Sequence, residues 1–250
     1  MRIAVIADVH ANLAALEAVS RVLTGVAPDR VLCLGDTVGY NAEPEACIDL
    51  VQARCDVILA GNHDVDVTIN RPSGGTHEVA RLVQAWTRDR LDAGRLDWLR
   101  TLRPKYVEPG VLLAHHGSFM GSDPTLGYVT STMLEENLRA IADAGEAPLA
   151  FCGHSHVPLM GWLTAAAVEE VQPRGEETVH WPSSAKAVLI NPGAVGQPRD
   201  RDPRASFAVV DTRQRSVTWH RVAYDIEETV LQIQRAGLPP ILGERLREGR

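Results

Sequence analysis

Short apolar runs alternate with amphipathic stretches through the first third of the chain. RIAVIA at residues 2–7 predicts a strand, and the next stretch places Leu13, Leu16 and Val19 on one helical face. The alternation continues with strand, helix and strand patterns in RVLCL, PEACIDLVQ and DVILA. Strands separated by helices pair in parallel and are covered on both faces, which explains runs that are apolar throughout. This part of the chain predicts an α/β fold.

The middle of the chain begins with helical patterns and then turns to strands. Residues 76–99 have helical periodicity, and the strands KYVE and VLLAH follow around a turn at Pro109 and Gly110, which predicts a hairpin. One more helix is predicted at 131–144, after which strand patterns dominate up to residue 222. The order is therefore mixed α/β first and β-rich second.

The last third contains three features whose placement the pattern leaves open. Residues 164–185 predict a protruding hairpin that turns at Arg174 and Gly175. A final helix is predicted at 226–236, and the tail at 237–250 is either frayed or docked. Because no repeat or low-complexity linker interrupts residues 1–250, we expect a single domain.

Composition narrows the class of protein. A hydrophobic content of 45% with 23% charged residues is typical of a globular protein. The net charge of −7, without a stripe of basic residues, disfavours binding to long nucleic acid. The four cysteines form no CxxC motif, and the apolar run before Asp8 is too short for a signal sequence or a membrane span. We therefore expect a cytoplasmic protein that does not bind membranes.

Five of the apolar runs end at residues that are able to bind metal. They are VIADVH (Asp8, His10), CLGDTVG (Asp36), LAGNHD (Asn62, His63, Asp64), LLAHHG (His115, His116) and FCGHSH (His154, His156). Each motif alone is typical of a turn, a helix cap or loop histidines. Their joint occurrence at strand ends indicates a site, because ligands of α/β sheets bind beyond the carboxyl ends of the strands.

The types and spacing of these side chains predict a dinuclear metal centre. Residues two apart in an extended chain point to the same side, so Asp8 with His10, and His154 with His156, are each expected to face one pocket. Oxygen and nitrogen donors without a thiolate suit Mn, Fe or Zn ions. Two Asp, one Asn and four His make seven donors, when one histidine of LLAHHG is counted and His63 and Asp64 are left out. Seven donors are too many for one tetrahedral ion. Two ions roughly 3.5–4 Å apart are typical of enzymes that hydrolyse phosphoesters.

At these positions the chain resembles the calcineurin-like metallophosphoesterase superfamily. The ordered signature of that family is DxH, GDxxx, GNHD or GNHE, a histidine at a strand end, and GHxH, and all five motifs occur between residues 8 and 156. GDTVGYNAEPEACIDLV and NPGAVGQPRDRDPRASFAVVD are also similar to stretches of its small bacterial and archaeal phosphoesterases. The resemblance implies a four-layer αββα sandwich with a dinuclear site at the strand ends.

The resemblance also implies a role for each metal-binding side chain. One ion would be bound by Asp8, His10, Asp36 and His156, and Asp36 would bridge to a second ion. That second ion would also be bound by Asn62, His154 and a strand-end histidine. LLAHHG offers His115 or His116 for this last position, and we favour His115 because it directly follows the apolar run. His116 would then lie at the rim or support a ligand.

Hydrolysis by a metal-bridging hydroxide follows from the same resemblance, with His63 as the histidine that binds no metal. His63 would protonate the leaving oxygen or stabilise charge on the phosphate, and Asp64 would either orient His63 or cap the next segment. Protein phosphatases of the superfamily carry GDxVDRG where this chain has GDTVGY. The change favours a small phosphoester or a nucleotide over a phosphoprotein.

Three further residues are candidates for substrate binding, each with a structural alternative. Tyr40 could stack on a base or simply pack in the core. Gly193 could let the backbone of NPGAVGQPRD approach a phosphate, or it could form a tight turn. Arg199 could add positive charge at the rim or be solvated.

We expect a hydrolase acting on a phosphomonoester, a phosphodiester or a dinucleoside polyphosphate. A nuclease with the same chemistry and a non-catalytic interaction module are the alternatives. The absence of a basic stripe disfavours the nuclease. The presence of His63 together with all of the expected metal ligands disfavours the non-catalytic module. A homo-oligomer is possible, and the predicted hairpin at 164–185 is one candidate interface.

Overall fold

The structure is a computed structural model that describes residues 1–69 and 78–250. Thr76 and His77, at the start of the predicted helical stretch, lie outside the described residues. Two mixed six-stranded sheets form the centre of the described part. The first sheet has the order β3 (Val57–Ile58), β2 (Arg30–Cys33), β1 (Arg2–Ile6), β11 (Ala205–Asp211), β12 (Ser216–Val222) and β9 (Glu177–His180). The second has the order β4 (Lys105–Glu108), β5 (Leu112–His115), β6 (Leu149–Phe151), β10 (Ala187–Asn191), β7 (Leu159–Leu163) and β8 (Val168–Val171).

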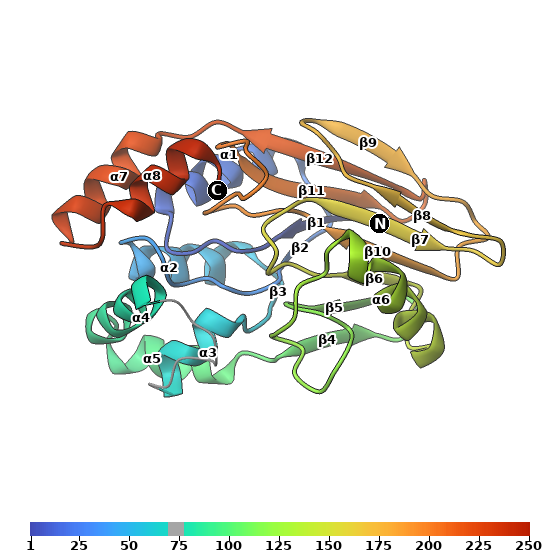
Figure 1. Cartoon of the computed structure of the whole chain (residues 1–250), viewed down its shortest axis with the longest axis horizontal. Helices are drawn as coiled ribbons and strands as arrows, with labels where there is room; N and C mark the ends of the chain where they lie inside the picture. The colour runs from blue at the N-terminus through green and yellow to red at the C-terminus, as the bar shows by residue number, and fades with distance from the viewer. Residues whose placement is uncertain (70–77) are drawn as a thin grey trace.

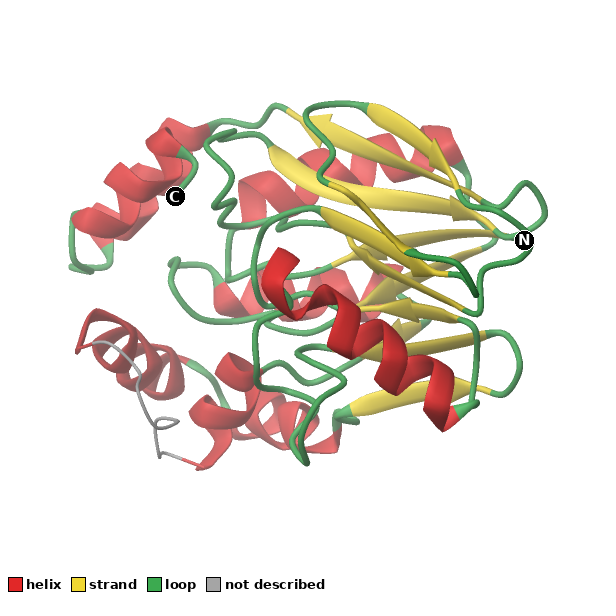
Figure 2. Ribbon diagram, turned by 45° about the vertical axis from the view of Figure 1, so that its right-hand side comes forward, coloured by secondary structure: helices red, strands yellow, loops and turns green. Residues whose placement is uncertain are grey.

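The two sheets pack face to face, with helices on their outer faces. Alternate residues of both sheets, such as Val5, Phe151 and Trp219, fill one core between them. Helices α1 (Leu13–Val26) and α2 (Pro44–Arg54) cover the outer face of the first sheet. Helix α6 (Ser131–Ala144) covers that of the second, as Figure 2 shows. This arrangement confirms the predicted four-layer αββα sandwich.

The remaining helices lie beyond one end of the sheets (Figure 1). They are α3 (Asn62–Ile69), α4 (Glu78–Arg90), α5 (Ala93–Thr101), α7 (Ile226–Arg235) and α8 (Ile241–Glu248). Helix α8 forms most of the tail whose state the sequence left open. Its Leu242 and Leu246 are buried against Val83 of α4 and Ile233 of α7, so the tail is docked. None of the described helices is long and apolar enough to cross a membrane.

Strand pairing confirms two predictions and corrects a third. β1, β2 and β3 pair in parallel, as the alternating pattern requires, and β4 and β5 form the predicted antiparallel hairpin. The predicted hairpin at 164–185 is wrong. Its two strands belong to different sheets, because β8 pairs with β7 and β9 pairs with β12. Residues 172–176 therefore cross between the sheets, and a local pattern does not show which sheet edge a strand joins.

Candidate metal centre

The polar strand ends identified in the sequence meet at one end of the sandwich. Asp8 and His10 follow β1, Asp36 follows β2, and Asn62 begins α3, the helix that follows β3. From the second sheet, His116 follows β5, and His154 with His156 follows β6. These strands run parallel within each sheet, so their carboxyl ends deliver side chains from both sheets to the same place.

The backbone at this end adopts a conformation that few non-glycine residues tolerate. Asp8, His10 and Asp36 have φ values of 56°, 48° and 53°, and His154 and His156 have 64° and 59°. A left-handed backbone costs about 1–2 kcal/mol per residue, so the surrounding hydrogen bonds must impose it. The amide of His10, for example, donates to the carbonyl of Asp36 at 2.8 Å. Left-handed turns, rather than the expected extended chain, therefore direct the side chains of the DxH and HxH motifs to the centre.

A first group of potential ligands consists of Asp8, His10, Asp36 and His156, all buried. Their donor atoms lie within 4.8 Å of one another. Nε2 of His156 lies 3.4 Å from Oδ1 of Asp8, and Nε2 of His10 lies 3.5 Å from Oδ2 of Asp36. This group is the set that the family resemblance implied for the first ion.

A second group consists of Asp36, His116 and His154, so Asp36 is common to both groups. Nε2 of His116 lies 3.2 Å from Oδ2 of Asp36. Asn62 adds a carboxamide whose Oδ1 is buried and has no hydrogen-bond partner in the part of the chain that the structure describes. Two groups that share one carboxylate are the arrangement that a dinuclear centre requires.

The preference for His115 is corrected, because the structure places His116 in the second group. His115 stacks on Phe119 with ring centroids 4.3 Å apart, and its Nδ1 faces the carbonyl of Ser118. The period of two along β5 explains the difference. Leu112 and Ala114 face the core between the sheets, and His116 continues that side, whereas Leu113 faces α6 and His115 continues the outer side.

Hydrogen bonds fix the tautomers of three of these histidines. Nδ1 of His10, His116 and His156 faces the carbonyl oxygens of Val38, Leu34 and Gln197 at 3.1, 2.9 and 2.6 Å. Because a carbonyl only accepts, each Nδ1 carries a proton, and in the neutral form of each ring Nε2 presents a lone pair to the site. This is the protonation state in which neutral histidine binds metal.

The lone pairs require a cation between them. Nε2 of His10 and Nε2 of His156 are 3.1 Å apart, and two lone pairs at that distance repel. Oδ2 of Asp36 and Nε2 of His116 lie 3.2 Å apart, are buried, and have no other hydrogen-bond partner among the described residues. A buried group in this state costs free energy until it is paired. The residues therefore fit divalent metal ions, whose oxygen and nitrogen ligands are of this type.

Burial sets the charge of most of these side chains. It lowers the pKa of His10 and His156 well below the usual value, and it lowers that of His154 to about 3, so these rings are neutral. Burial also raises the pKa of Asp8 to about 7. Although burial lowers the pKa of His116, the carboxylates of Asp36 and Asp8 outweigh it and raise this pKa to about 9, so at neutral pH Nε2 of this ring carries a proton that it would lose on binding a metal ion. The negative charge of the carboxylates thus attracts a cation to this point.

The family follows from comparison with known proteins. The family model for the calcineurin-like phosphoesterase superfamily domain matches residues 1–215. The chain belongs to this superfamily. The uncharacterized protein MJ0912 of Methanocaldococcus jannaschii is 32% identical over 248 residues, which cover 99% of this chain and 98% of that protein.

Solved structures of similar proteins have the same fold. A metallophosphoesterase from Sphaerobacter thermophilus is 37% identical, with a TM-score of 0.84, over 100% of this chain and 99% of that one. The hypothetical protein PH1004 from Pyrococcus horikoshii OT3 is 18% identical, with a TM-score of 0.78, over 100% of this chain and 98% of that one. The calcineurin-like architecture therefore extends over the whole chain, including the tail beyond residue 215.

His63 lies beside the calcineurin-like centre but outside both ligand groups. Its ring centroid is 4.9 Å from that of His10 and 4.6 Å from that of Tyr40, and its Nδ1 is buried without a hydrogen-bond partner within residues 1–69 and 78–250. Its amide donates to Oδ1 of Asp36 at 2.9 Å, which fixes the first turn of α3 against the centre. Gly39 leaves room for this ring, because a Cβ there would lie 2.6 Å from Nδ1.

Asp64 caps a helix, one of the two alternatives that the sequence left open. Its carboxylate accepts the amides of Gly61 at 3.0 Å and Val38 at 3.1 Å. As the third residue of α3, it reaches back to the residue before the helix, which is half of a capping box. Asp64 thereby joins the start of α3 to the loop after β2. Both oxygens are used by the backbone, so a catalytic role for this residue has no support.

The three candidates for substrate binding have different surroundings. Tyr40 lies over the centre, 4.6 Å from the ring of His10, and Nη2 of Arg199 donates to its hydroxyl at 3.3 Å. The prediction that Gly193 binds a phosphate through its backbone is wrong, because its amide donates to Oδ1 of Asn191 at 2.9 Å and is not free. The loop instead supports β1, since the amide of Gly196 donates to the carbonyl of Asp8.

Two residues at the mouth of the centre were missed by the sequence reasoning. Tyr128, 51% exposed, stacks on His154 with ring centroids 4.4 Å apart. Arg245 of α8 lies over Tyr40, with Cζ 5.9 Å from the ring centroid. The sequence contains no signal for either residue, because neither belongs to a motif. For Arg245, the sequence also does not show that the tail is docked.

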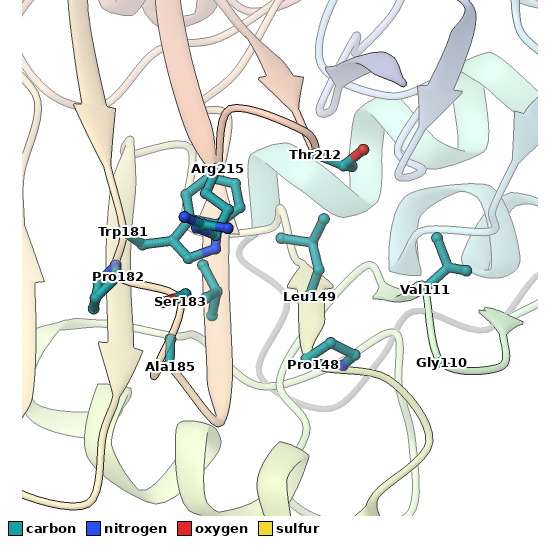
Figure 3. A pocket seen from close by; sticks show the side chains of 11 residues that line it. Gly110, Val111, Pro148, Leu149, Trp181, Pro182, Ser183, Ala185, Thr212 and Arg215 are labelled. Carbon is teal, nitrogen blue, oxygen red and sulfur yellow. The ribbon is translucent and has the colours of Figure 1, made fainter.

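A second concave region lies at the opposite end of the sheets (Figure 3). Residues near the amino ends of β5, β6 and β10 surround a cavity of about 300 Å³, together with Trp181 and Arg215. Arg215 is the one charged side chain in the described lining, and no group of metal-competent donors lies there. Within the described residues, the chemistry is therefore concentrated at the carboxyl ends.

Proposed function

We propose that this protein is a metal-dependent hydrolase of small phosphoesters. Its substrate is a phosphomonoester, a phosphodiester or a dinucleoside polyphosphate, and its cofactors are two divalent ions of Mn, Fe or Zn. The observation that carries the proposal is the pair of ligand groups sharing Asp36, with a histidine beside them that belongs to neither. Family membership gives the same class of chemistry.

The residues of the chain would divide the work. Asp8, His10, Asp36 and His156 would hold one ion, and Asp36, Asn62, His116 and His154 would hold the other. When bound, the ions would supply a nucleophile derived from water and neutralise negative charge at phosphorus. The backbone hydrogen bonds at Nδ1 of three histidines keep the ligand set in place.

His63 would serve the leaving group. Burial lowers the pKa of His63, so the ring is neutral before substrate binds. A phosphate anion beside the ring would favour the protonated form, which can then donate a proton from nitrogen to the leaving oxygen. Its ring is free to do so, because Nδ1 has no partner within the described part of the chain.

The alternatives fit less well. A nuclease needs a broad basic surface, and the net charge is −7. A non-catalytic module does not need an unpartnered histidine beside the ligands. A phosphoprotein phosphatase is disfavoured because Gly39 and Tyr40 stand where that subfamily carries Asp and Arg, and the ring of Tyr40 lies over the centre.

The test is a hydrolysis panel with added Mn²⁺. Wild type and His63→Ala are assayed on p-nitrophenyl phosphate, its bis ester, 2′,3′-cyclic nucleotides and diadenosine tetraphosphate. His180→Ala is the matched control, because this histidine is exposed on β9. We expect wild type and the control to turn over at least one substrate and His63→Ala to be slower with its metal retained. Stoichiometric metal without turnover of any substrate would overturn the proposal.

A further inference from the structure

Two arginines from distant parts of the sequence meet at one aromatic ring. Cζ of Arg199 lies 5.8 Å from the ring centroid of Tyr40, and Cζ of Arg245 lies 5.9 Å from it. Arg199 comes from the loop after β10 and Arg245 from the last helix, α8. Burial and the positive charge of Arg199 both lower the pKa of Arg245, so the fold maintains an electrostatically unfavourable arrangement of two cations.

Among the described residues, no side-chain carboxylate pairs with either guanidinium, although the fold pairs many other arginines. Arg204 pairs with Asp202, Arg221 with Asp200 and Arg247 with Glu227. In contrast, the described residues place no carboxylate oxygen of a side chain within 4.0 Å of Arg199 or Arg245.

The donors of this arginine pair are only partly used. Nε of Arg199 is buried without a hydrogen-bond partner among the described residues, and its Nη2 is 3.3 Å from the hydroxyl of Tyr40 and 3.5 Å from Oε1 of Gln197. Nε of Arg245 donates to the main-chain oxygen of Arg250 at 3.1 Å. An arginine fork with unused donors is suited to a phosphate, which accepts two parallel hydrogen bonds.

The fold holds both arginines in place before any ligand binds. Leu242 and Leu246 anchor α8 in a cluster that Tyr40 also contacts. The amide of Arg201 donates to the carbonyl of Gly249 at 2.9 Å, which ties the loop of Arg199 to the end of α8. The pair is therefore preorganised, and a ligand would not have to order it.

The arginine pair lies on the side of the centre where His63 lies. The ring of Tyr40, which both arginines flank, is 4.6 Å from the ring of His63. If His63 protonates the leaving oxygen, the rest of the leaving group extends from His63 toward Tyr40 and the two arginines.

We propose that Arg199 and Arg245 bind a second phosphate, carried by the leaving group of the substrate. The substrate class is then a small ester with two phosphates, of which the one at the metal centre is hydrolysed and the other is held by the arginines. This inference rests on the proposed function for the direction of the leaving group. Arg245 gives the docked tail a role in specificity.

The experiment compares two ligands that differ by one phosphate, propane-1,3-diol monophosphate and propane-1,3-diol bisphosphate. Calorimetry measures their binding to the Mn²⁺-loaded protein, and inhibition of p-nitrophenyl phosphate hydrolysis gives a second readout. The variants are Arg199→Ala, Arg245→Ala and Arg245→Gln. The matched control is Arg247→Ala, which removes the same charge from the exposed face of the same helix.

We expect wild type and Arg247→Ala to bind the bisphosphate more tightly than the monophosphate by about 10- to 100-fold, the range for hydrogen bonds to charged groups. Each variant at Arg199 or Arg245 should lose most of that preference while its affinity for the monophosphate changes little. Equal affinity of wild type for both ligands would overturn the inference, as would an equal loss for both ligands in Arg245→Ala and Arg245→Gln.

Calorimetry also separates this inference from the proposed function. A protein that prefers the bisphosphate through Arg245 but hydrolyses nothing would refute the hydrolase and keep the anion site. Hydrolysis of p-nitrophenyl phosphate without any preference for the bisphosphate would support the hydrolase and refute the anion site. Thermal unfolding of each variant checks that α8 stays docked.

Discussion

The choice between two neighbouring histidines is the sharpest test of the metal centre. His116→Ala removes a fully buried ring whose Nε2 lies 3.2 Å from Oδ2 of Asp36. His115→Ala removes a ring that stacks on Phe119 on the other side of the strand. The two variants delete the same side chain one residue apart, so they differ in the direction of the side chain and not in composition.

The expected effect follows from the number of ions. An ion present at 100 times its dissociation constant stabilises the folded state by about 2.7 kcal/mol. For a chain of this length, each kcal/mol shifts Tm by about 2–4 °C, so each bound ion raises Tm by about 5–10 °C. Removing a supporting group costs about 10- to 100-fold in metal affinity, and a ligand should cost at least as much. At a 100-fold loss, the contribution of the second ion falls to about 0.4 kcal/mol.

The assay measures the rise in Tm that Mn²⁺ causes, together with metal content after dialysis at a fixed free Mn²⁺ concentration. Comparing each variant with and without Mn²⁺ removes the packing cost of the lost ring. For His115→Ala, the lost stacking costs about 0.5–1.5 kcal/mol in either condition. We expect two ions and the full rise in Tm for His115→Ala, and about 1.5 ions or fewer with little more than half the rise for His116→Ala.

The opposite pattern would refute the reasoning from the strand period. If His115→Ala lost an ion and His116→Ala kept both, the side chain at the end of β5 would have to face the centre, contrary to the packing of Leu112 and Ala114. If neither variant lost an ion, the second ligand group would not bind metal.

Three further predictions follow from contacts at the centre. His63→Ala should keep both ions and slow hydrolysis by about 10²- to 10⁴-fold, measured as kcat with metal content determined in parallel; loss of metal in this variant would contradict the assignment. Asp64→Ala should lower the free energy of unfolding by about 2–4 kcal/mol in urea with a chelator present, because the buried amides of Gly61 and Val38 lose their acceptor. An unchanged midpoint would exclude the capping role. Gly61→Ala should reduce metal content, because its Cβ would overlap Oδ1 of Asp36, and equal metal content in the variant and wild type would refute this.

Much of the fold could be predicted because the relevant patterns are local. The apolar runs of β1, β2 and β3 and the helices between them require parallel pairing, and the turn at Pro109 and Gly110 requires a hairpin. The prediction of a hairpin at 164–185 was wrong because the deciding information is not local. Its strands have the pattern of edge strands, but each sheet offers an edge, and only the packed structure decides that β8 joins one and β9 the other.

The metal centre, like the fold, could be predicted from the sequence only in part. The types of its side chains and their positions after apolar runs are visible in the sequence, and most of them converge in the structure. Gly193 was misjudged because the partner of its amide, the side chain of Asn191, depends on how the loop folds. Asp64 could not be assigned, because the sequence does not show that α3 begins at Asn62.

The sequence by itself determined which residues carry the chemistry, since donor type and strand-end position are properties of short segments. The tertiary structure decided which of them face the centre, because direction depends on the sheet face and on the elements packed against it. His116 replaced His115 for this reason, since the face that β5 turns toward the first sheet is set by the sandwich. Arg245 was added for the same reason, because apolar contacts with α4, with α7 and with the segment of Tyr40 bring the tail to the ring of Tyr40.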